Sequence, residues 1–172
     1  MNTSHYKWLW LSAVLIVLDQ VSKYWAEHIL EYRVIPIFSW FDFSLVHNTG
    51  AAFGFLNQAG GWQHVFFVAL AVSITGVLLF MIKALASHER HLAIAYSLII
   101  AGALGNAIDR IIYQYVVDFV HWFILDCNFM GAQDCHYPHF NIADMAIFIG
   151  AFLLISEAFG KPFLNLDENI TR

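Results

Sequence analysis

Two aspartates lie in apolar surroundings, and their positions in the chain allow them to meet. Asp118 follows a long apolar run, in "VVDF", and Asp144 lies one turn inside another, in "FNIADMAIFIGAFLLI". An ionised side chain at membrane depth costs roughly 2.5–3.5 kcal/mol even on lenient insertion scales, so it usually has a functional or pairing role. Neither aspartate has a Lys or Arg within four residues. A functional role is therefore favoured over simple charge pairing for both.

Two such carboxylates would share a proton if the fold brought them together. At about 4 Å separation they would repel by roughly 4 kcal/mol at an effective dielectric near 20, which corresponds to about three pKa units. The pair would titrate as a unit. Its ionised member could take a proton from water while its protonated member donates to a substrate carbonyl. This is aspartic-protease chemistry, and it needs neither a metal nor a covalent intermediate.

Other polar residues accompany these two in the apolar segments, and each has a structural alternative. Asp19 and Lys23 are four residues apart, so they could form a helical ion pair or line a site. Asp109 and Arg110 are adjacent and could form an ion pair that braces their helix. For the second pair, structural support is favoured over catalysis.

Composition indicates an integral membrane protein. Of the 172 residues, 60% are hydrophobic and only 12% are charged, which is too few to cover a water-facing surface. Four apolar runs are long enough to span a bilayer, at about 8–25, 62–82, 92–112 and 140–159. We therefore expect a single integral membrane domain over 1–172 with outer loops at 26–61 and 113–139. The net charge of -5 is scattered and gives no reason to expect nucleic acid as a partner.

The distribution of basic residues predicts the orientation. Outside the spans, one side of the predicted topology carries five basic residues: Lys7, Lys83, Arg90, Lys161 and Arg172. The two longer loops carry only Arg33, so both termini are predicted to be cytoplasmic. At about 1.5 Å per residue, the acids of three spans then reach similar depth in the outer half of the membrane. Asp118 and Asp144 flank one hairpin that can bring them together.

Five motifs now make a recognisable set, and they occur in a fixed order over nearly the whole chain. They are "DQVSK" at 19–23, "HNTGAAFGFL" at 47–56, "GNAIDR" at 105–110, "VVDF" at 116–119 and "FNIAD" at 140–144. Together they resemble the motifs of bacterial lipoprotein signal peptidase, the type II signal peptidase.

The resemblance implies an aspartic endopeptidase of the bacterial inner membrane. Such an enzyme removes signal peptides from prolipoproteins that carry diacylglycerol on a cysteine, and it cuts just before that cysteine. The implied partners are these substrates and membrane lipid, and globomycin is the implied inhibitor. No cofactor or metal is implied. Nothing in the sequence requires a partner chain, so a monomer is expected.

The resemblance also implies a fold and a set of site residues. The fold would be all-α, with four transmembrane helices, a small extracytoplasmic β-cradle and an outer helical arm. The catalytic pair would be Asp118 and Asp144. Substrate-binding or supporting residues would be Asp19, Lys23, Asn48, Gly50, Asn106, Asp109, Arg110 and Asn141. The alternation of apolar and polar residues in "FDFSLVHN", at 41–48, independently predicts a half-buried strand.

The outer loop at 113–139 holds the chain's two cysteines, Cys127 and Cys135. In an oxidising compartment they could form a disulfide that pins the loop. A metal site made by Cys135, His136 and His139 is the less favoured alternative. In the preceding loop, the Phe53 and Phe55 side chains could contact substrate or only anchor the loop in the interface.

Two other classes of protein remain as competing interpretations. A transporter or proton pathway also uses acids within the membrane, but it needs polar groups across the full depth. Here the inner halves of the second and fourth runs are nearly bare of polar residues until Glu157. In an assembly subunit, the acids would be incidental. The position of the polar residues favours the peptidase.

Overall fold

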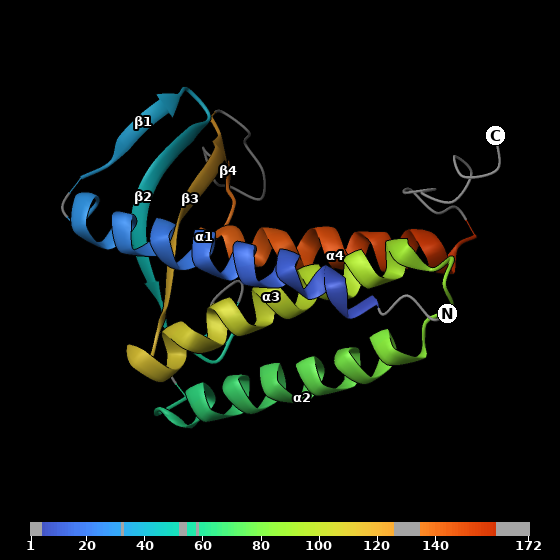
Figure 1. The fold of residues 1–172 in the computed structure, drawn as a ribbon. Coiled ribbons are helices and arrows are strands. Elements are labelled where there is room, and N and C mark those ends of the chain that lie inside the picture. The colour runs from blue at the N-terminus through green and yellow to red at the C-terminus, as the bar shows by residue number, and fades with distance from the viewer. Residues whose placement is uncertain (1–4, 32, 52–54, 58, 126–134, 161–172) are drawn as a thin grey trace.

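Four long helices form the body of the protein (Figure 1). The computed structural model describes residues 5–31, 33–51, 55–57, 59–125 and 135–160. After a short 3-10 turn, η1 (His5–Trp8), the helices are α1 (Leu9–Ile29), α2 (Trp62–Ala84), α3 (Arg90–Ile112) and α4 (Ile142–Ala158). The predicted apolar runs match these helices to within a few residues at each end. The largest difference is at the end of α1, which continues four residues past the predicted boundary.

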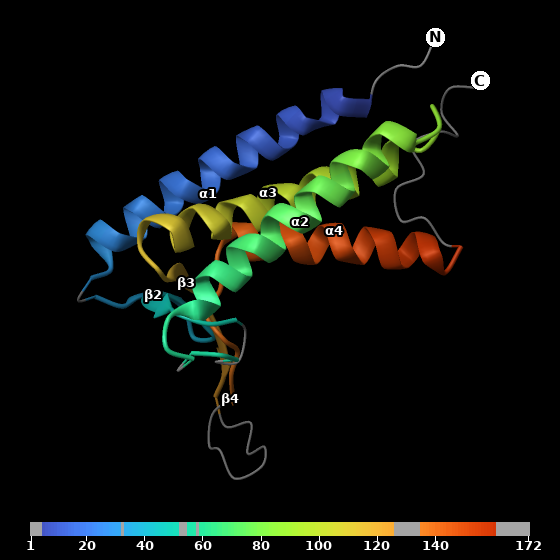
Figure 2. The same ribbon diagram turned by 90° about the horizontal axis from the view of Figure 1, so that it is seen from below.

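Helix α3 packs against the other three helices (Figure 2). Its contact face is made largely of alanine and glycine, which allows close backbone approach. A Cβ atom at Gly102 would collide with the carbonyl oxygen of Ala143 on α4, and one at Gly150 would lie 2.8 Å from the Ala95 carbonyl oxygen. The position of α4 against α3 is therefore set by backbone contact at these glycines.

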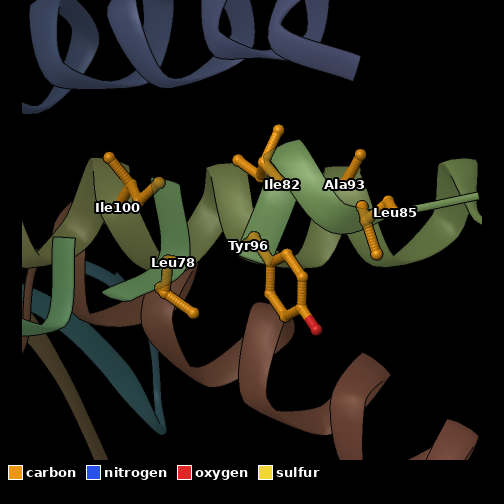
Figure 3. Packing of buried hydrophobic residues seen from close by; sticks show 6 residues of the cluster. All are labelled: Leu78, Ile82, Leu85, Ala93, Tyr96 and Ile100. Atoms are coloured by element: carbon orange, nitrogen blue, oxygen red, sulfur yellow. The ribbon is translucent and has the colours of Figure 1, made fainter. Parts of the chain in front are cut away.

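A cluster of larger apolar side chains joins α2 to α3 at the end of the bundle away from the sheet (Figure 3). Its buried members are Leu78, Ile82, Leu85, Ala93, Tyr96 and Ile100. Ile82 is almost fully buried between the two helices, at 1% exposure. This cluster fixes α2 to α3, whereas most of the remaining α2 surface is exposed.

Two helices, α2 and α3, are long and apolar enough to cross a membrane. Helix α1 carries Asp19, Lys23 and Glu27, and α4 has 17 residues, so neither meets the same criteria of length and composition. Exposed large apolar side chains nevertheless cover parts of α1, α2 and α4, as expected of surfaces that face lipid. The four-span topology stays a prediction.

A small antiparallel sheet stands at the other end of the bundle, with strand order β1-β2-β3-β4. The strands are β1 (Ile35–Phe38), β2 (Phe41–Asn48), β3 (Val116–Ile124) and β4 (Cys135–His136). The predicted strand at 41–48 is confirmed as β2. A register irregularity between Phe43 and Val46 interrupts its pairing with β3. No helix besides α1–α4 and η1 occurs in the described part of the chain, so the outer helical arm is not confirmed.

Candidate active site

Asp118 and Asp144 line the same cavity, which has a volume of about 510 Å³. Asp118 lies on β3 with 2% of its surface exposed, and Asp144 lies in the first turn of α4. The structure thus brings the two acids to one cavity, as their positions in the chain predict. It arises because β3 runs past the start of α4, where the Val120 backbone pairs with that of Phe140.

Asn141 binds both acids. It is the N-cap residue of α4, and its Oδ1 accepts from the Asp144 amide at 2.9 Å. In return its own amide donates to Asp144 Oδ2 at 3.2 Å, which completes a capping box. Its Nδ2 donates to Asp118 Oδ1 at 2.7 Å. The fully buried side chain of Asn141 thus fixes the start of α4 and orients the Asp118 carboxyl group, while the Asn141 backbone amide holds the Asp144 carboxyl group.

Two further asparagines donate to the same pair. Asn106 Nδ2 lies 2.7 Å from Asp144 Oδ1, and Asn48 Nδ2 lies 3.0 Å from Asp118 Oδ2. With the two donors of Asn141, each carboxyl group receives two hydrogen bonds. These donors come from β2, α3 and the start of α4, so the geometry depends on both the sheet and the bundle.

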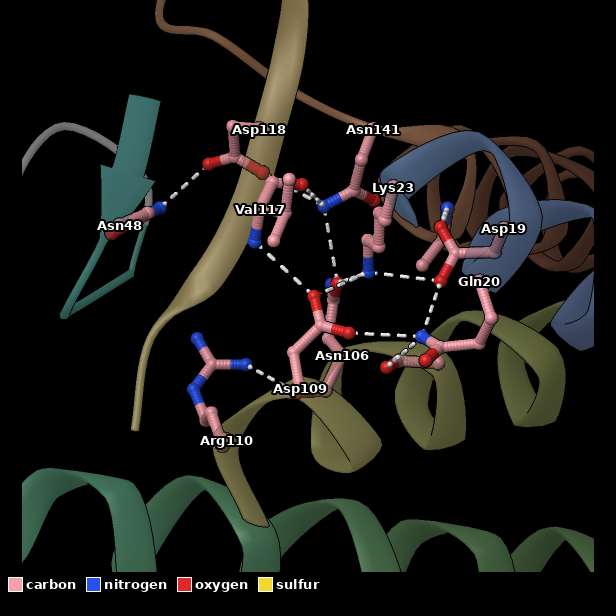
Figure 4. Close-up of polar contacts among 12 residues, drawn as sticks. Asp19, Gln20, Lys23, Asn48, Asn106, Asp109, Arg110, Val117, Asp118 and Asn141 are labelled. Atoms are coloured by element: carbon pink, nitrogen blue, oxygen red, sulfur yellow. Dashed lines mark hydrogen bonds and ion pairs between the residues drawn. The ribbon is translucent and has the colours of Figure 1, made fainter. Parts of the chain in front are cut away.

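A buried ion cluster lies behind the asparagines (Figure 4). Lys23 Nζ is 2.8 Å from Asp19 Oδ2 and 2.9 Å from Asp109 Oδ2, and it donates to Asn106 Oδ1 at 3.0 Å. All three charged side chains are at most 3% exposed. The predicted pairing of Asp19 with Lys23 is confirmed. The cluster also holds Asn106, so it bears on the orientation of Asp144.

The predicted ion pair between Asp109 and Arg110 is wrong. Asp109 faces α1 and pairs with Lys23, because adjacent helical residues point in different directions. Its Oδ2 also accepts from the Val117 amide at 3.1 Å, which links α3 to the start of β3. Arg110 instead donates to the Gly50 carbonyl at 2.8 Å and lies 4.7 Å from the ring centre of Phe67.

Gly50 is required for close packing of the loop after β2. A Cβ atom there would collide with the Phe55 carbonyl oxygen and with the side chain of Asn57. Its amide also donates to Asn48 Oδ1 at 3.0 Å. The close approach of the two backbone segments therefore depends on the absence of a side chain at Gly50. Phe55 is exposed, and Phe53 lies outside the described residues.

The electrostatic setting of Asp118 favours its protonated form. Burial and the neighbouring charge of Asp144 raise the pKa of Asp118 from 3.8 to about 7, against the opposing effect of the hydrogen bonds from Asn48 and Asn141. A carboxyl group with such a pKa can hold a proton near neutral pH.

The cavity has one polar and one apolar part. Arg110 lines the polar part with both acids, and Arg110 Nε is buried without a hydrogen-bond partner in the described part of the chain. The apolar part follows the helices and is lined by Phe67, Leu70, Ala71, Ile74, Ala103, Ile147, Phe148 and Ala151. Such a division suits an apolar ligand with a polar group near its end.

Sequence reasoning missed Gln20. Its Nε2 donates to Asp109 Oδ1 at 2.9 Å and to the Gly105 carbonyl at 3.2 Å, which joins α1 to α3. The available signal was a polar amide next to Asp19 in an otherwise apolar run. Hydropathy alone does not say which neighbour such an amide meets.

Cys135 and His136 form β4, and His139 follows in the segment that leads to α4. Cys135 is not a free thiol, but Cys127 lies outside the described residues, so their pairing stays a prediction. His136 and His139 bond to other side chains of the sheet, His121 and Ser44. No group of three or more metal-ligating side chains is arranged for a metal within the described ranges.

Solved structures with this arrangement of helices and sheet are bacterial membrane enzymes. One, solved at 1.9 Å, superposes with a TM-score of 0.73 at 28% identity and covers 92% of this chain and 97% of its own. Another, solved at 2.3 Å, gives a TM-score of 0.69 at 30% identity over 94% and 92% of the two chains. The fold and the apolar helices together indicate a membrane enzyme.

The sequence comparisons define the family. The signal peptidase (SPase) II family matches residues 11–160. A lipoprotein signal peptidase of Psychromonas ingrahamii is 45% identical, over 92% of this chain and 88% of its own. One from Alteromonas mediterranea is 42% identical, over 95% and 86%. The chain belongs to the signal peptidase II family.

Proposed function

We propose that the protein is a lipoprotein signal peptidase of the aspartic type, with Asp118 and Asp144 as its catalytic pair. Its substrates would be prolipoproteins that carry diacylglycerol on a cysteine, and it would cut the bond just before that cysteine. The observation that carries the proposal is the bridging of both acids by Asn141 within one cavity. A structural role alone would not require two carboxyl groups, each with two donors, to face the same cavity.

The reaction follows from a pair that holds one proton. The ionised carboxylate takes a proton from water as the water oxygen attacks the scissile carbonyl carbon, and the protonated carboxyl group donates its proton to the carbonyl oxygen. When the tetrahedral intermediate collapses, the C–N bond breaks and a carboxyl group of the pair returns a proton to the leaving amine of the cysteine. The Arg110 guanidinium, which lines the polar part of the cavity, would bind a substrate carbonyl, and Asn48, Asn106 and Asn141 would hold the carboxyl groups.

The apolar part of the cavity supplies a path for the signal peptide. It extends along α4 from Asp144 to Ala151, about 10 Å at 1.5 Å per residue. Its opposite wall is α2, which packs mainly against α3. An apolar segment that enters beside α2 and α4 would place its polar end at the catalytic pair, and the substrate's lipid chains would stay in the bilayer.

The proposed topology has four spans, both termini in the cytoplasm and the cavity on the periplasmic side of the inner membrane. It is supported by the excess of Lys and Arg at the termini and the α2–α3 connection. The short connection is Leu85 to Glu89, at the end of the bundle opposite the sheet. The proposed single domain of 1–172 follows from the same arrangement.

The test is cleavage of a diacylglyceryl-modified prolipoprotein by purified enzyme in detergent. Asp118→Asn and Asp144→Asn should each lower kcat by about a thousandfold or more, because the pair acts as a unit. Glu31→Gln, an acid-to-amide change in the turn after α1, should leave kcat unchanged. Persistence of cleavage in both aspartate variants would contradict the proposal.

A further inference from the structure

Three histidines surround the carboxylate of Asp42 on the sheet, beside the proposed catalytic cavity. His121 Nδ1 is 3.2 Å from Asp42 on the neighbouring strand, and His136 Nδ1 is 3.1 Å from His121 Nε2. On a second branch, Ser44 Oγ is 2.7 Å from Asp42 Oδ1 and 2.8 Å from His139 Nε2. Asp42 and His121 are buried, at 9% and 8% exposure.

The carboxylate fixes the direction of the hydrogen bonds on the Ser44 branch and of the bond from His121. Ionised Asp42 only accepts, so Ser44 Oγ and His121 Nδ1 both donate to it. The Ser44 oxygen is then available to accept from His139 Nε2–H. His121 Nε2 and His136 Nδ1 share a further hydrogen bond. The hydrogen bond to Ser44 therefore fixes the tautomer of the neutral His139 ring, with its proton on Nε2.

His139 is held as a rigid part of this network. Its ring stacks on that of His121, with the centroids 4.2 Å apart and the planes 2° from parallel. Burial lowers the pKa of His139 to about 4, so the ring is neutral at neutral pH. The hydrogen bond to Ser44 and the stacking on His121 together fix both its position and its orientation.

His139 also lines the proposed catalytic cavity, together with Tyr137 and Pro138. This wall belongs to the segment that runs along β3, where the Tyr137 amide donates to the Trp122 carbonyl at 2.8 Å. The apolar part of the cavity extends the other way, along α4 to Ala151. If the signal peptide occupies the apolar part, the chain beyond the cleaved bond must pass the wall formed by 137–139.

We propose that His139, oriented by Ser44 and Asp42, is a specificity-determining residue that contacts the first residues after the lipidated cysteine. This inference rests on the proposed function. The contact would contribute to substrate binding more than to chemistry, because Asn141, which holds the catalytic pair, does not depend on His139 for its position. Its side chain binds Asp118, Asn106 and the Val117 carbonyl.

The experiment compares kcat and KM for two lipid-modified substrates, one with several residues after the cysteine and one that ends at the cysteine amide. With the longer substrate, His139→Ala should raise KM about tenfold and change kcat less than twofold. Ser44→Ala should raise KM similarly, and the double variant should be no worse than either single one, since both changes remove the same fixed contact. With the short substrate, these variants should match the wild type.

Conservative variants separate positioning from loss of bulk. Gln places its amide nitrogen near the position of His Nε2, so His139→Gln should restore KM to within about threefold of the wild type, while His139→Asn should not. His28→Ala, at the exposed end of α1, is the matched control and should leave both constants unchanged. Thermal unfolding in detergent shows which variants are folded, and if His139→Ala is not, Ser44→Ala and His139→Gln decide.

Three results would overturn the inference: an unchanged KM in Ser44→Ala and in the His139 variants, an equal rise with the short substrate, or a fall in kcat alone. Cleavage by the wild type with loss of cleavage in Asp118→Asn would then still support the proposed function. Failure of the wild type to cleave, or retained activity in both aspartate variants, would instead reject the proposed function itself.

Discussion

The hydrogen bond from Asn48 to Asp118 should set the upper pH limit of the enzyme. Asn48 Nδ2 donates to Asp118 Oδ2 at 3.0 Å and stabilises the ionised form. A hydrogen bond to a charged, buried group contributes roughly 1.5–3 kcal/mol, and 1.36 kcal/mol corresponds to about one pKa unit. Asn48→Ala should therefore raise the pKa of Asp118 above its value of about 7 by about one unit or more.

The assay is kcat/KM for a lipid-modified prolipoprotein from about pH 5 to about pH 10. Activity falls on the alkaline side when the pair loses its shared proton, a property of the pair and not of one acid. In Asn48→Ala the proton is retained to higher pH. The alkaline limb should therefore move upward by about one unit.

Asn48→Asp separates this effect from disturbance of the loop. It keeps an oxygen that can accept from the Gly50 amide, as Asn48 Oδ1 does at 3.0 Å, but it places a second carboxylate next to Asp118. The alkaline limb should then shift further upward than in Asn48→Ala, because a like charge disfavours ionisation. An alkaline limb that stays in place or moves downward in both variants would refute the argument.

Other predictions concern stability in detergent. Lys23→Met leaves two buried carboxylates without their shared cation, so we expect a loss of about 3–5 kcal/mol in the free energy of unfolding; an unchanged thermal midpoint would contradict this. Gly102→Ala drives a methyl group into the Ala143 carbonyl and should cost about 1–3 kcal/mol, whereas Gly76→Ala, which meets no atom within 4 Å, should not destabilise. The pKa of Asp118 is raised from 3.8 to about 7 in the native state. Between these two pH values the native state therefore binds more protons than the unfolded state. Stability should therefore fall as pH rises through that window, by up to about 4 kcal/mol, and Asp118→Asn should remove this part of the pH dependence.

The helices could be predicted from the sequence because each is a continuous apolar run of suitable length. β2 could be predicted because apolar and polar residues alternate along 41–48. β3 could not be predicted in the same way, because Val116–Ile124 begins with four buried residues in succession and shows no clear alternation. Its pairing with β2, about 70 residues away, has no local signal.

The candidate site was predictable as a set of residues but not as a set of contacts. The motifs named Asn141 only as a supporting residue, although the pattern Asn141-x-x-Asp144 is that of a capping box, which places both at a helix start. The pairing of Asp109 was mispredicted because its partner, Lys23, comes from another helix. Sequence neighbours suggest ion pairs, but side-chain direction on a helix decides them.

The position of α2 places membrane lipid next to the proposed substrate-binding cavity. It rests mainly on α3 and exposes most of its surface, while the cavity lies between it and α4. In a bilayer, acyl chains would fill that open side until a substrate displaces them. A substrate that enters the cavity then replaces lipid acyl chains with its own apolar segment. The rate and the affinity of substrate binding should therefore vary with the thickness and fluidity of the surrounding bilayer.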